Sequence, residues 1–172
     1  MQPVDPAADI VLAFIKALKQ AFNPDDVVQP PVGGGSKEVW TFAGDGALPD
    51  AQLCKGVPWL WVRLDRRYRV RKRDFPAAYV GVLDCKNPDV RRAVAIEIGV
   101  ARCTTMEANP KRAVLEDEAT IGLDDSWRIA LALCMASDAL TAVGHAVVTD
   151  TVAPVGPEGG MIAWTGMSYV QY

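Results

Sequence analysis

The sequence predicts an α+β domain, in which a small, mainly antiparallel sheet carries two main helices packed on one face. Two segments, near the N-terminus and around residues 126–145, have apolar residues at helical spacing. Three other segments alternate apolar and polar residues, as half-buried strands do. A chain of 172 residues can hold one domain with a real core but not two ordinary ones, so we expect a single domain over residues 1–172.

The first helix is predicted over residues 5–22, followed by a long irregular loop at about 23–58. Asp5 can cap the helix and Pro6 suits its first turn. The loop contains five prolines and six glycines between residues 24 and 58, with one short strand expected at 38–43. The apolar face of the helix is expected to consist of Val11, Phe14, Ile15, Leu18 and Phe22.

Three longer strands are predicted, at residues 59–70, 91–106 and 161–172. The second has two unlike faces. One face is large and apolar, so it requires a helix on it, whereas the other is small and flat and can take a neighbouring chain closely. The large face consists of Val94, Ile96, Ile98 and Val100, and the small face of Ala93, Ala95, Glu97, Gly99 and Ala101.

The second helix is predicted over about 126–145, with Asp124, Asp125 and Ser126 as candidate N-caps. Residues 109–122 before it are polar and are expected to form a loop or a short helix. Residues 154–160 after it are expected to form a tight turn. The expected apolar stripe of this helix is Trp127, Ala130, Leu131, Cys134 and residues 136–140, with Asp138 at its edge.

Composition excludes several classes of function. No apolar run approaches the ~20 residues of a membrane span, and the N-terminus lacks the pattern of a signal peptide. His145 is the only histidine, no local signature of a nucleophile and its base exists, and the Gly33–Ser36 segment lacks the lysine of a phosphate-binding loop. We therefore expect no enzyme, no cofactor and no metal.

The four cysteines are spaced by 31, 18 and 31 residues, without a CxxC pair. This spacing gives little support to a zinc site. We expect reduced, mostly buried thiols in a protein made in the cytosol. They are Cys54, Cys85, Cys103 and Cys134.

The most unusual local feature is a basic run from Arg63 to Arg73. It has seven basic residues against Asp65 and carries a net charge of +6, so the rest of the chain carries −9 if the whole carries −3. Contact with the acidic surface of another copy or of a protein partner is favoured over contact with nucleic acid. Tyr68 within the run gives the basic patch with an aromatic residue that nucleic-acid binding would use. The candidate interface residues are Arg66, Arg67, Arg69, Arg71, Lys72 and Arg73, with Glu116, Asp117 and Glu118 as the acidic counterpart.

Two tryptophans add to these candidates. Trp59 and Trp61 point to the same side of one predicted strand. Both cannot easily be central in so small a core, so an exposed aromatic pair is expected there, which would mark an interface.

Several short motifs resemble one family. They are Gly99-Val100-Ala101-Arg102-Cys103 at the end of a strand, a helix containing Asp138, and the turn at 156–160 before a tryptophan-bearing strand. Cys54 ahead of the 59–64 strand and Phe75-Pro76 ahead of Cys85 fit the same pattern. From about residue 5 to 172 the chain resembles the tail terminator (tail completion) proteins of long-tailed bacteriophages, in the version carried by phages of actinobacteria.

The resemblance implies a structural virion protein with a tail-terminator-like fold. Such a protein forms a ring, usually of six copies, that caps the tail tube in the neck and joins it to the head connector. The implied partners are further copies, the tail tube protein and a head-side stopper or adaptor, with genomic DNA passing through without sequence-specific contact. Assembly would take place in the host cytoplasm, without a membrane. A head-closure stopper or adaptor, and a small nucleic-acid-binding protein using the Arg63–Arg73 hairpin, remain as alternatives.

Overall fold

The computed structural model describes residues 5–43, 56–82 and 86–172. It is an α+β structure with a mainly antiparallel sheet, as predicted. Cys54 and Cys85 lie outside the described residues. The elements are α1 (Ala7–Ala21), β1 (Val39–Ala43), β2 (Trp59–Arg71), the 3-10 turn η2 (Lys72–Asp74), β3 (Val90–Cys103), α2 (Arg112–Ala142), β4 (Ala146–Thr149), β5 (Ala153–Glu158) and β6 (Met161–Gln171).

The sheet has six strands in the order β1-β2-β3-β6-β4, with β5 also paired to β6. β1 runs parallel to β2, and the other pairs are antiparallel. The long strands β2, β3 and β6 form its centre, and β3 pairs with both of its neighbours over most of its length. The predicted strands at 38–43, 59–70, 91–106 and 161–172 are therefore confirmed to within a few residues.

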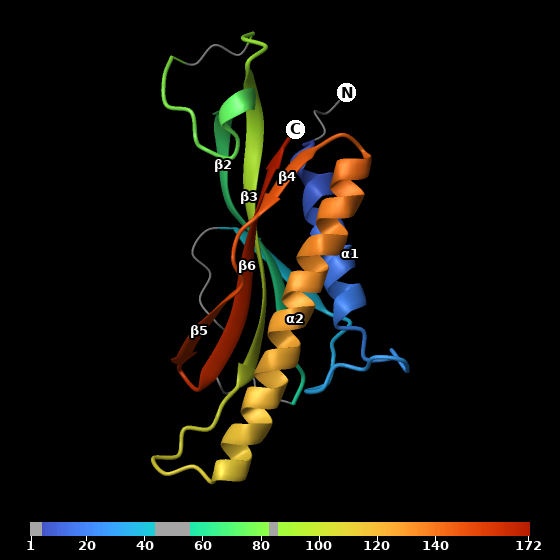
Figure 1. Cartoon of the computed structure of the whole chain (residues 1–172), viewed down its shortest axis with the longest axis vertical. Helices are drawn as coiled ribbons and strands as arrows, with labels where there is room; N and C mark the ends of the chain where they lie inside the picture. Colours follow the sequence, from blue (N-terminus) through green and yellow to red (C-terminus); the bar gives the residue numbers. More distant parts are fainter. Residues whose placement is uncertain (1–4, 44–55, 83–85) are drawn as a thin grey trace.

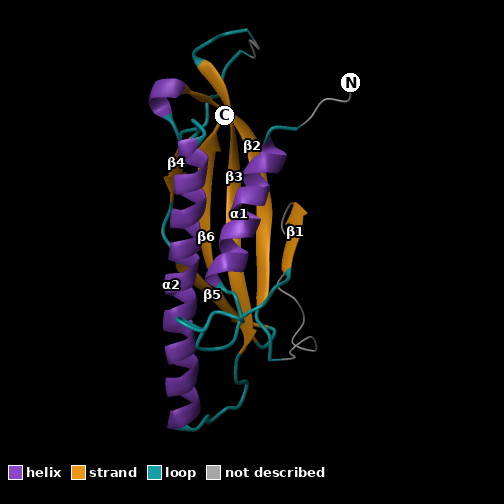
Figure 2. Ribbon diagram, turned by 90° about the vertical axis from the view of Figure 1, so that its right-hand side faces the viewer, coloured by secondary structure: helices purple, strands orange, loops and turns teal. Residues whose placement is uncertain are grey.

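The main core lies between the sheet and the two helices, which stand side by side before the sheet in Figure 2. Every second residue of the central strands enters it, which is the period of a half-buried strand. Burying each large side chain here contributes roughly 1.5–3 kcal/mol. The fully buried members include Ile10, Phe14 and Leu18 of α1, Ile129 of α2, Leu60 and Val62 of β2, Val94, Ile96, Ile98 and Val100 of β3, and Val170 of β6.

The predictions for α2 are wrong at its start and on its buried face. The helix begins at Arg112 and has 31 residues, so Asp124, Asp125 and Ser126 lie inside it and cap nothing. The reason is that Asp125 and Arg128 lie on the buried side of the helix, where their charges are paired. Because these two residues are polar, the apolar periodicity in the sequence does not reveal the buried face. The buried apolar residues are Ile129, Ala132, Leu133, Ala136 and Leu140, whereas Trp127, Ala130 and Cys134 are exposed. Asp138 is exposed, as expected for the edge of a stripe.

Gly144 ends α2. Its φ of 94° lies in the left-handed region that favours glycine. Its N–H donates to Thr141 O at 3.0 Å, and the N–H of His145 donates to Leu140 O at 3.1 Å. This pair of hydrogen bonds is a Schellman motif, which satisfies the last carbonyls and turns the chain directly into β4.

The tight turn predicted at 154–160 is also wrong. Residues Ala153–Glu158 form β5, and only Gly159 and Gly160 turn the chain. Pro154 and Pro157 do not prevent this, because β5 is an edge strand and an edge strand tolerates missing N–H donors. Among the described helices, none is long and apolar enough to span a membrane.

A second apolar cluster lies on the opposite face of the sheet. Trp61, Ala101, Met161 and Ala163 are buried in it, with Phe42 and Trp59 packed against them. Gly99 makes room for the indole of Trp61, because a Cβ at Gly99 would lie 2.2 Å from that ring. The small residues of β3 are thus used partly to accommodate an aromatic side chain of the same protein.

Replacing Gly99 by valine is expected to destabilise the protein by about 1–3 kcal/mol, because the indole of Trp61 must leave its place. Urea denaturation measures the change. The exposed strand residue Ala146 provides the control, since Ala146→Val places the same valine side chain at an exposed position. Equal stability of the two variants would contradict the close contact between Gly99 and Trp61.

Candidate interaction surfaces

A basic arm extends from one end of the molecule. β2 and β3 pair from Trp59↔Ala101 to Arg71↔Val90 and continue beyond the helices, where the chain turns back (Figure 1). We call the described residues 66–82 and 86–92 the arm. They include nine basic residues and two acidic ones. Two backbone hydrogen bonds hold the described parts of the turn against the strands, Tyr79 N to Arg69 O at 2.7 Å and Lys72 N to Asp89 O at 3.0 Å.

The arginines of β2 are divided between two faces, as strand alternation requires. The ladder shifts between Leu64 and Arg66, so Arg66 pairs with Ala95 on the face away from the helices, and Arg67 pairs with Val94 on the helix side. Arg66 lies 5.5 Å from the Tyr68 ring. Arg67 forms an ion pair with Asp5, before α1. Arg67 is therefore already used within the fold.

The tip of the arm carries both charge and apolar surface. Arg71 stacks 4.9 Å over the ring of Tyr79, and Arg69 lies on the same side of β2 by alternation. Val80 and Val82 are 94% and 86% exposed. A hollow of about 750 Å³ in the arm is lined by Arg71, Lys72, Arg73, Tyr79, Asn87, Asp89 and Val90.

The expected exposed tryptophan pair is not found. Trp61 is only 3% exposed and donates from Nε1 to Glu97 Oε1 at 3.0 Å. Trp59 is half-buried and stacks on Phe42 with ring centroids 5.9 Å apart. The two tryptophans lie on the same face of the sheet, as predicted. Because Gly99 has no side chain, the indole of Trp61 packs closely against β3, and both tryptophans belong to the second apolar cluster. The tryptophans exposed among the described residues are Trp40 and Trp127, which sequence reasoning did not select as interface residues.

The acidic triplet lies at the other end of the molecule, on the first turns of α2 (Figure 1). Glu116 accepts a hydrogen bond from Arg112 Nε at 2.6 Å, and Asp117 is exposed. Glu118 is different, because its carboxylate accepts bonds from Thr104 Oγ1 and from the N–H of Thr105, at 2.9 and 2.6 Å. Glu118 thus holds the end of β3 against α2, and only Glu116 and Asp117 are well placed for a partner.

An apolar groove of about 440 Å³ lies beside these acids, between α2 and the ends of β3 and β6. Leu115 and Leu123 on its helix wall are 47% and 74% exposed. Nε1 of Trp164 is buried here without a hydrogen-bond partner among the described residues. The main lining residues are Thr104, Leu115, Ala119, Leu123, Ile162 and Trp164.

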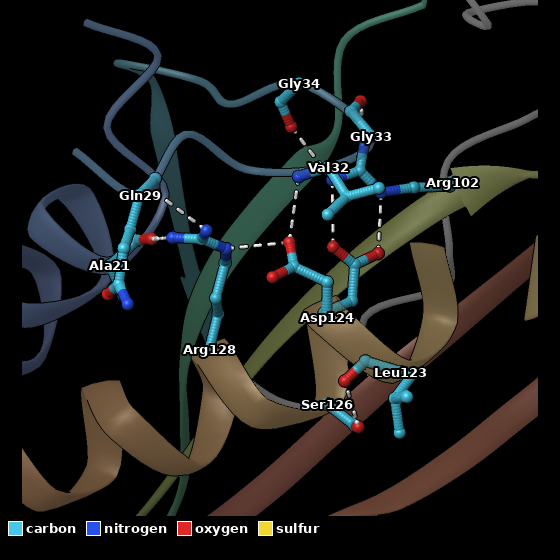
Figure 3. A network of polar contacts seen from close by, with 11 residues as sticks. Ala21, Gln29, Val32, Gly33, Gly34, Arg102, Leu123, Asp124, Ser126 and Arg128 are labelled. Atoms are coloured by element: carbon cyan, nitrogen blue, oxygen red, sulfur yellow. Dashed lines mark hydrogen bonds and ion pairs between the residues drawn. The ribbon is translucent and has the colours of Figure 1, made fainter. Parts of the chain in front are cut away.

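A buried ion pair joins the middle of α2 to β3, and Figure 3 labels its arginine, Arg102. Asp125, 2% exposed, accepts two hydrogen bonds from Arg102, from Nε at 2.6 Å and from Nη2 at 2.8 Å. Arg102 also donates to the carbonyls of Gly33 and Gly34, which fixes the loop after α1. Burial raises the pKa of Asp125 above its ordinary value, and the bonds from Arg102 oppose that rise.

A second pair joins the neighbouring acid Asp124 to Arg128, one turn further along α2. Arg128, 4% exposed, donates to Asp124 Oδ2 at 2.8 Å, to Ala21 O at 2.6 Å and to Gln29 O at 2.9 Å. The N–H of Val32 donates to the same Asp124 oxygen at 2.9 Å. Sequence reasoning missed both arginines, although the i,i+4 spacing of Asp124 and Arg128 is a signal that could have shown this pair.

The cysteines differ from the expectation of reduced, mostly buried thiols. Cys103 is disulfide-bonded. Cys134 is a free thiol, but it is exposed on α2. Residue spacing could not show either outcome, because a disulfide depends on which strands and loops the fold brings together. Within the described ranges, no group of three or more His, Cys, Asp and Glu residues could hold a metal ion.

Replacing Asp125 by alanine is expected to cost about 3–5 kcal/mol of stability, because Arg102 keeps a buried charge without its counterion. Chemical denaturation measures the loss. Asp117→Ala on the exposed side of the same helix should change stability by less than about 0.5 kcal/mol. The double variant Arg102→Met/Asp125→Leu should recover much of the loss, since it removes both charges. A loss no larger than that of Asp117→Ala would contradict a structural role for the pair.

The pairing of Asp5 with Arg67 predicts a pH effect of known sign. The bond from Arg67, followed by that from the N–H of Ala7, holds the pKa of the Asp5 carboxyl below its ordinary value. The stability that this pairing contributes is therefore present above about pH 4 and lost as the pH falls through the lowered pKa. An NMR titration should show the Asp5 pKa rising in Arg67→Ala and staying in place in Arg66→Ala, whose side chain lies on the other face. An unchanged Asp5 pKa in Arg67→Ala would show that the two side chains do not interact in solution.

Comparisons with known proteins do not identify a family. No protein-family model matches the chain, and no curated protein matches it.

Proposed function

We propose that the chain is a structural virion protein, a tail terminator that forms a ring at the top of a phage tail. The observation that carries the proposal is that the two ends of this elongated molecule (Figure 1) carry unlike surfaces, one basic and one with acidic residues beside an apolar groove. One end is the basic arm with exposed Val80 and Val82, and the other is the start of α2 with Glu116, Asp117 and the apolar groove. Two different patches that match are what a heterologous, ring-forming contact requires.

The proposed fold is tail-terminator-like in its finer features, with both helices on one face of the sheet. The short motifs Gly99–Cys103 and Gly156–Gly160 that resemble this family fall at the end of β3 and in the β5–β6 hairpin. The other sheet face bears the Trp61 cluster and the ion pair of Arg63 with Glu97 at 2.7 Å. In this proposal the ring has six copies, caps the tail tube protein and offers its upper surface to a head-side stopper or adaptor.

The ring lies in the neck of the virion after assembly in the host cytoplasm. Genomic DNA passes through it without sequence-specific contact, and neither an enzyme activity, a cofactor nor a membrane is involved. A head-closure stopper or adaptor would use the same unlike ends, so it is the nearest alternative.

A small nucleic-acid-binding protein is the second alternative, and the stacking of Arg71 on Tyr79 favours it. Two observations favour a protein partner instead. The arginines of β2 are divided between two faces, and Arg67 is paired with Asp5. A net charge of −3 also weakens any general attraction to nucleic acid.

Electron microscopy of particles made without a functional gene for this chain tests the proposal. Overlong, uneven tail tubes separated from filled heads are expected, because the tube has lost its stop signal. Tails of normal length beside leaking or empty heads would instead assign a head-side stopper or adaptor. Normal, infectious particles would overturn the virion role and leave salt-sensitive binding of DNA by the arm as the function to test.

A further inference from the structure

We propose that the arm tip of one copy docks into the apolar groove of the next copy, with Val80 and Val82 in the groove and the basic residues 71–73 beside Glu116 and Asp117. This inference rests on the proposed ring and names the contact that closes it. The occupant is a second copy of this chain, and both complementary surfaces are present in the described residues.

The arm tip has the character of an inserted segment. Val80 and Val82 are almost fully exposed, which leaves two branched apolar side chains in water at the far end of a hairpin. Behind them, the ring of Tyr79 is held by Arg71, and the N–H of Tyr79 is bonded to Arg69 O. The segment is therefore supported up to the valines, which lowers the entropy that docking would cost.

The groove has the size and lining to receive it. Its volume of about 440 Å³ is within the range of ordinary binding pockets. Leu115 and Leu123 remain exposed on its wall, and covering them together with the two valines would remove four large apolar side chains from water. Glu118 is bonded to Thr104 and Thr105 next to the groove, so the wall is held in place before a partner arrives.

Charge sets the orientation of the contact. Arg71, Lys72 and Arg73 line one hollow together with Tyr79, the residue before Val80, and Glu116 and Asp117 follow Leu115 on α2. With the valines in the groove, the two sets of opposite sign face each other at its rim. The groove is lined by residues of the first half of α2. The start of α2 and the far ends of β2 and β3 lie at opposite ends of the molecule (Figure 1), so one copy cannot fill its own groove.

Photo-crosslinking of the full chain tests the contact directly. A photoreactive phenylalanine replaces Val80, isotope-labelled and unlabelled copies are mixed, and mass spectrometry identifies links between copies. Links to residues 115–126 or 162–164 are expected. The same residue placed at Leu12, which is 58% exposed on α1, is the matched control and should give few links to these segments.

The outcomes separate the contact from the ring. A ring in sedimentation experiments whose Val80 links fall elsewhere would overturn the docking and leave the ring intact. A chain that stays monomeric up to about 1 mM and forms no links between copies would overturn both.

A charge exchange provides the second test. Reversing Arg71, Lys72 and Arg73 to glutamate should weaken association by about tenfold or more. Adding Glu116→Lys and Asp117→Lys to the same chain should restore it, and Glu118 is left unchanged because it holds Thr104 and Thr105. The control Lys16→Glu/Lys19→Glu shifts the net charge in the same direction on α1 and should have little effect. Failure of the exchange to restore association would overturn the proposed pairing.

Discussion

The buried pair of Asp125 and Arg102 determines how the layers of this protein fit together. The pair lies where α2, β3 and the loop after α1 meet. Arg102 donates hydrogen bonds both to the backbone carbonyls of that loop and to the Asp125 carboxylate. A Cβ at Gly33 would lie 2.8 Å from the Arg102 guanidinium, so the loop must approach without a side chain. Asp124 and Arg128 repeat the arrangement one turn later and reach the end of α1. Charges this deeply buried must be paired, which gives the helix a single position along the sheet.

That position leaves both ends of the molecule free for contacts. α2 is anchored at its centre and at its second half, by Ile129, Leu133 and Leu140, so its first turns extend past the sheet and form one wall of the groove. At the other end, β2 and β3 extend beyond the helices and form the arm (Figure 1). The unlike ends on which the proposed ring depends are thus consequences of where the core stops.

The two faces of the sheet have different tasks. The helix face is filled by branched aliphatic side chains and supplies most of the core. On the other face, small residues such as Gly99 and Ala101 leave room for the indole of Trp61. Glu97 on this face accepts hydrogen bonds from Trp61 and Arg63. An aromatic residue that looked like an interface from the sequence is therefore a structural residue, whereas Trp40 and Trp127 are the exposed ones.

The sequence by itself determined the first helix and the strands β1, β2, β3 and β6, because these follow from local period, as the match of the predicted 38–43 segment to β1 illustrates. Only the tertiary structure decided the length and buried face of α2. Asp124, Asp125 and Arg128 resemble cap or surface residues until Arg102 and the loop carbonyls supply their partners from far along the chain. β5 and the disulfide of Cys103 were decided in the same way, by neighbours that no local pattern encodes. The physical reason is that long-range partners decide where a charge can be buried, where an edge strand pairs and which cysteine forms a disulfide. Amphipathic periods need only residues that are close in the sequence.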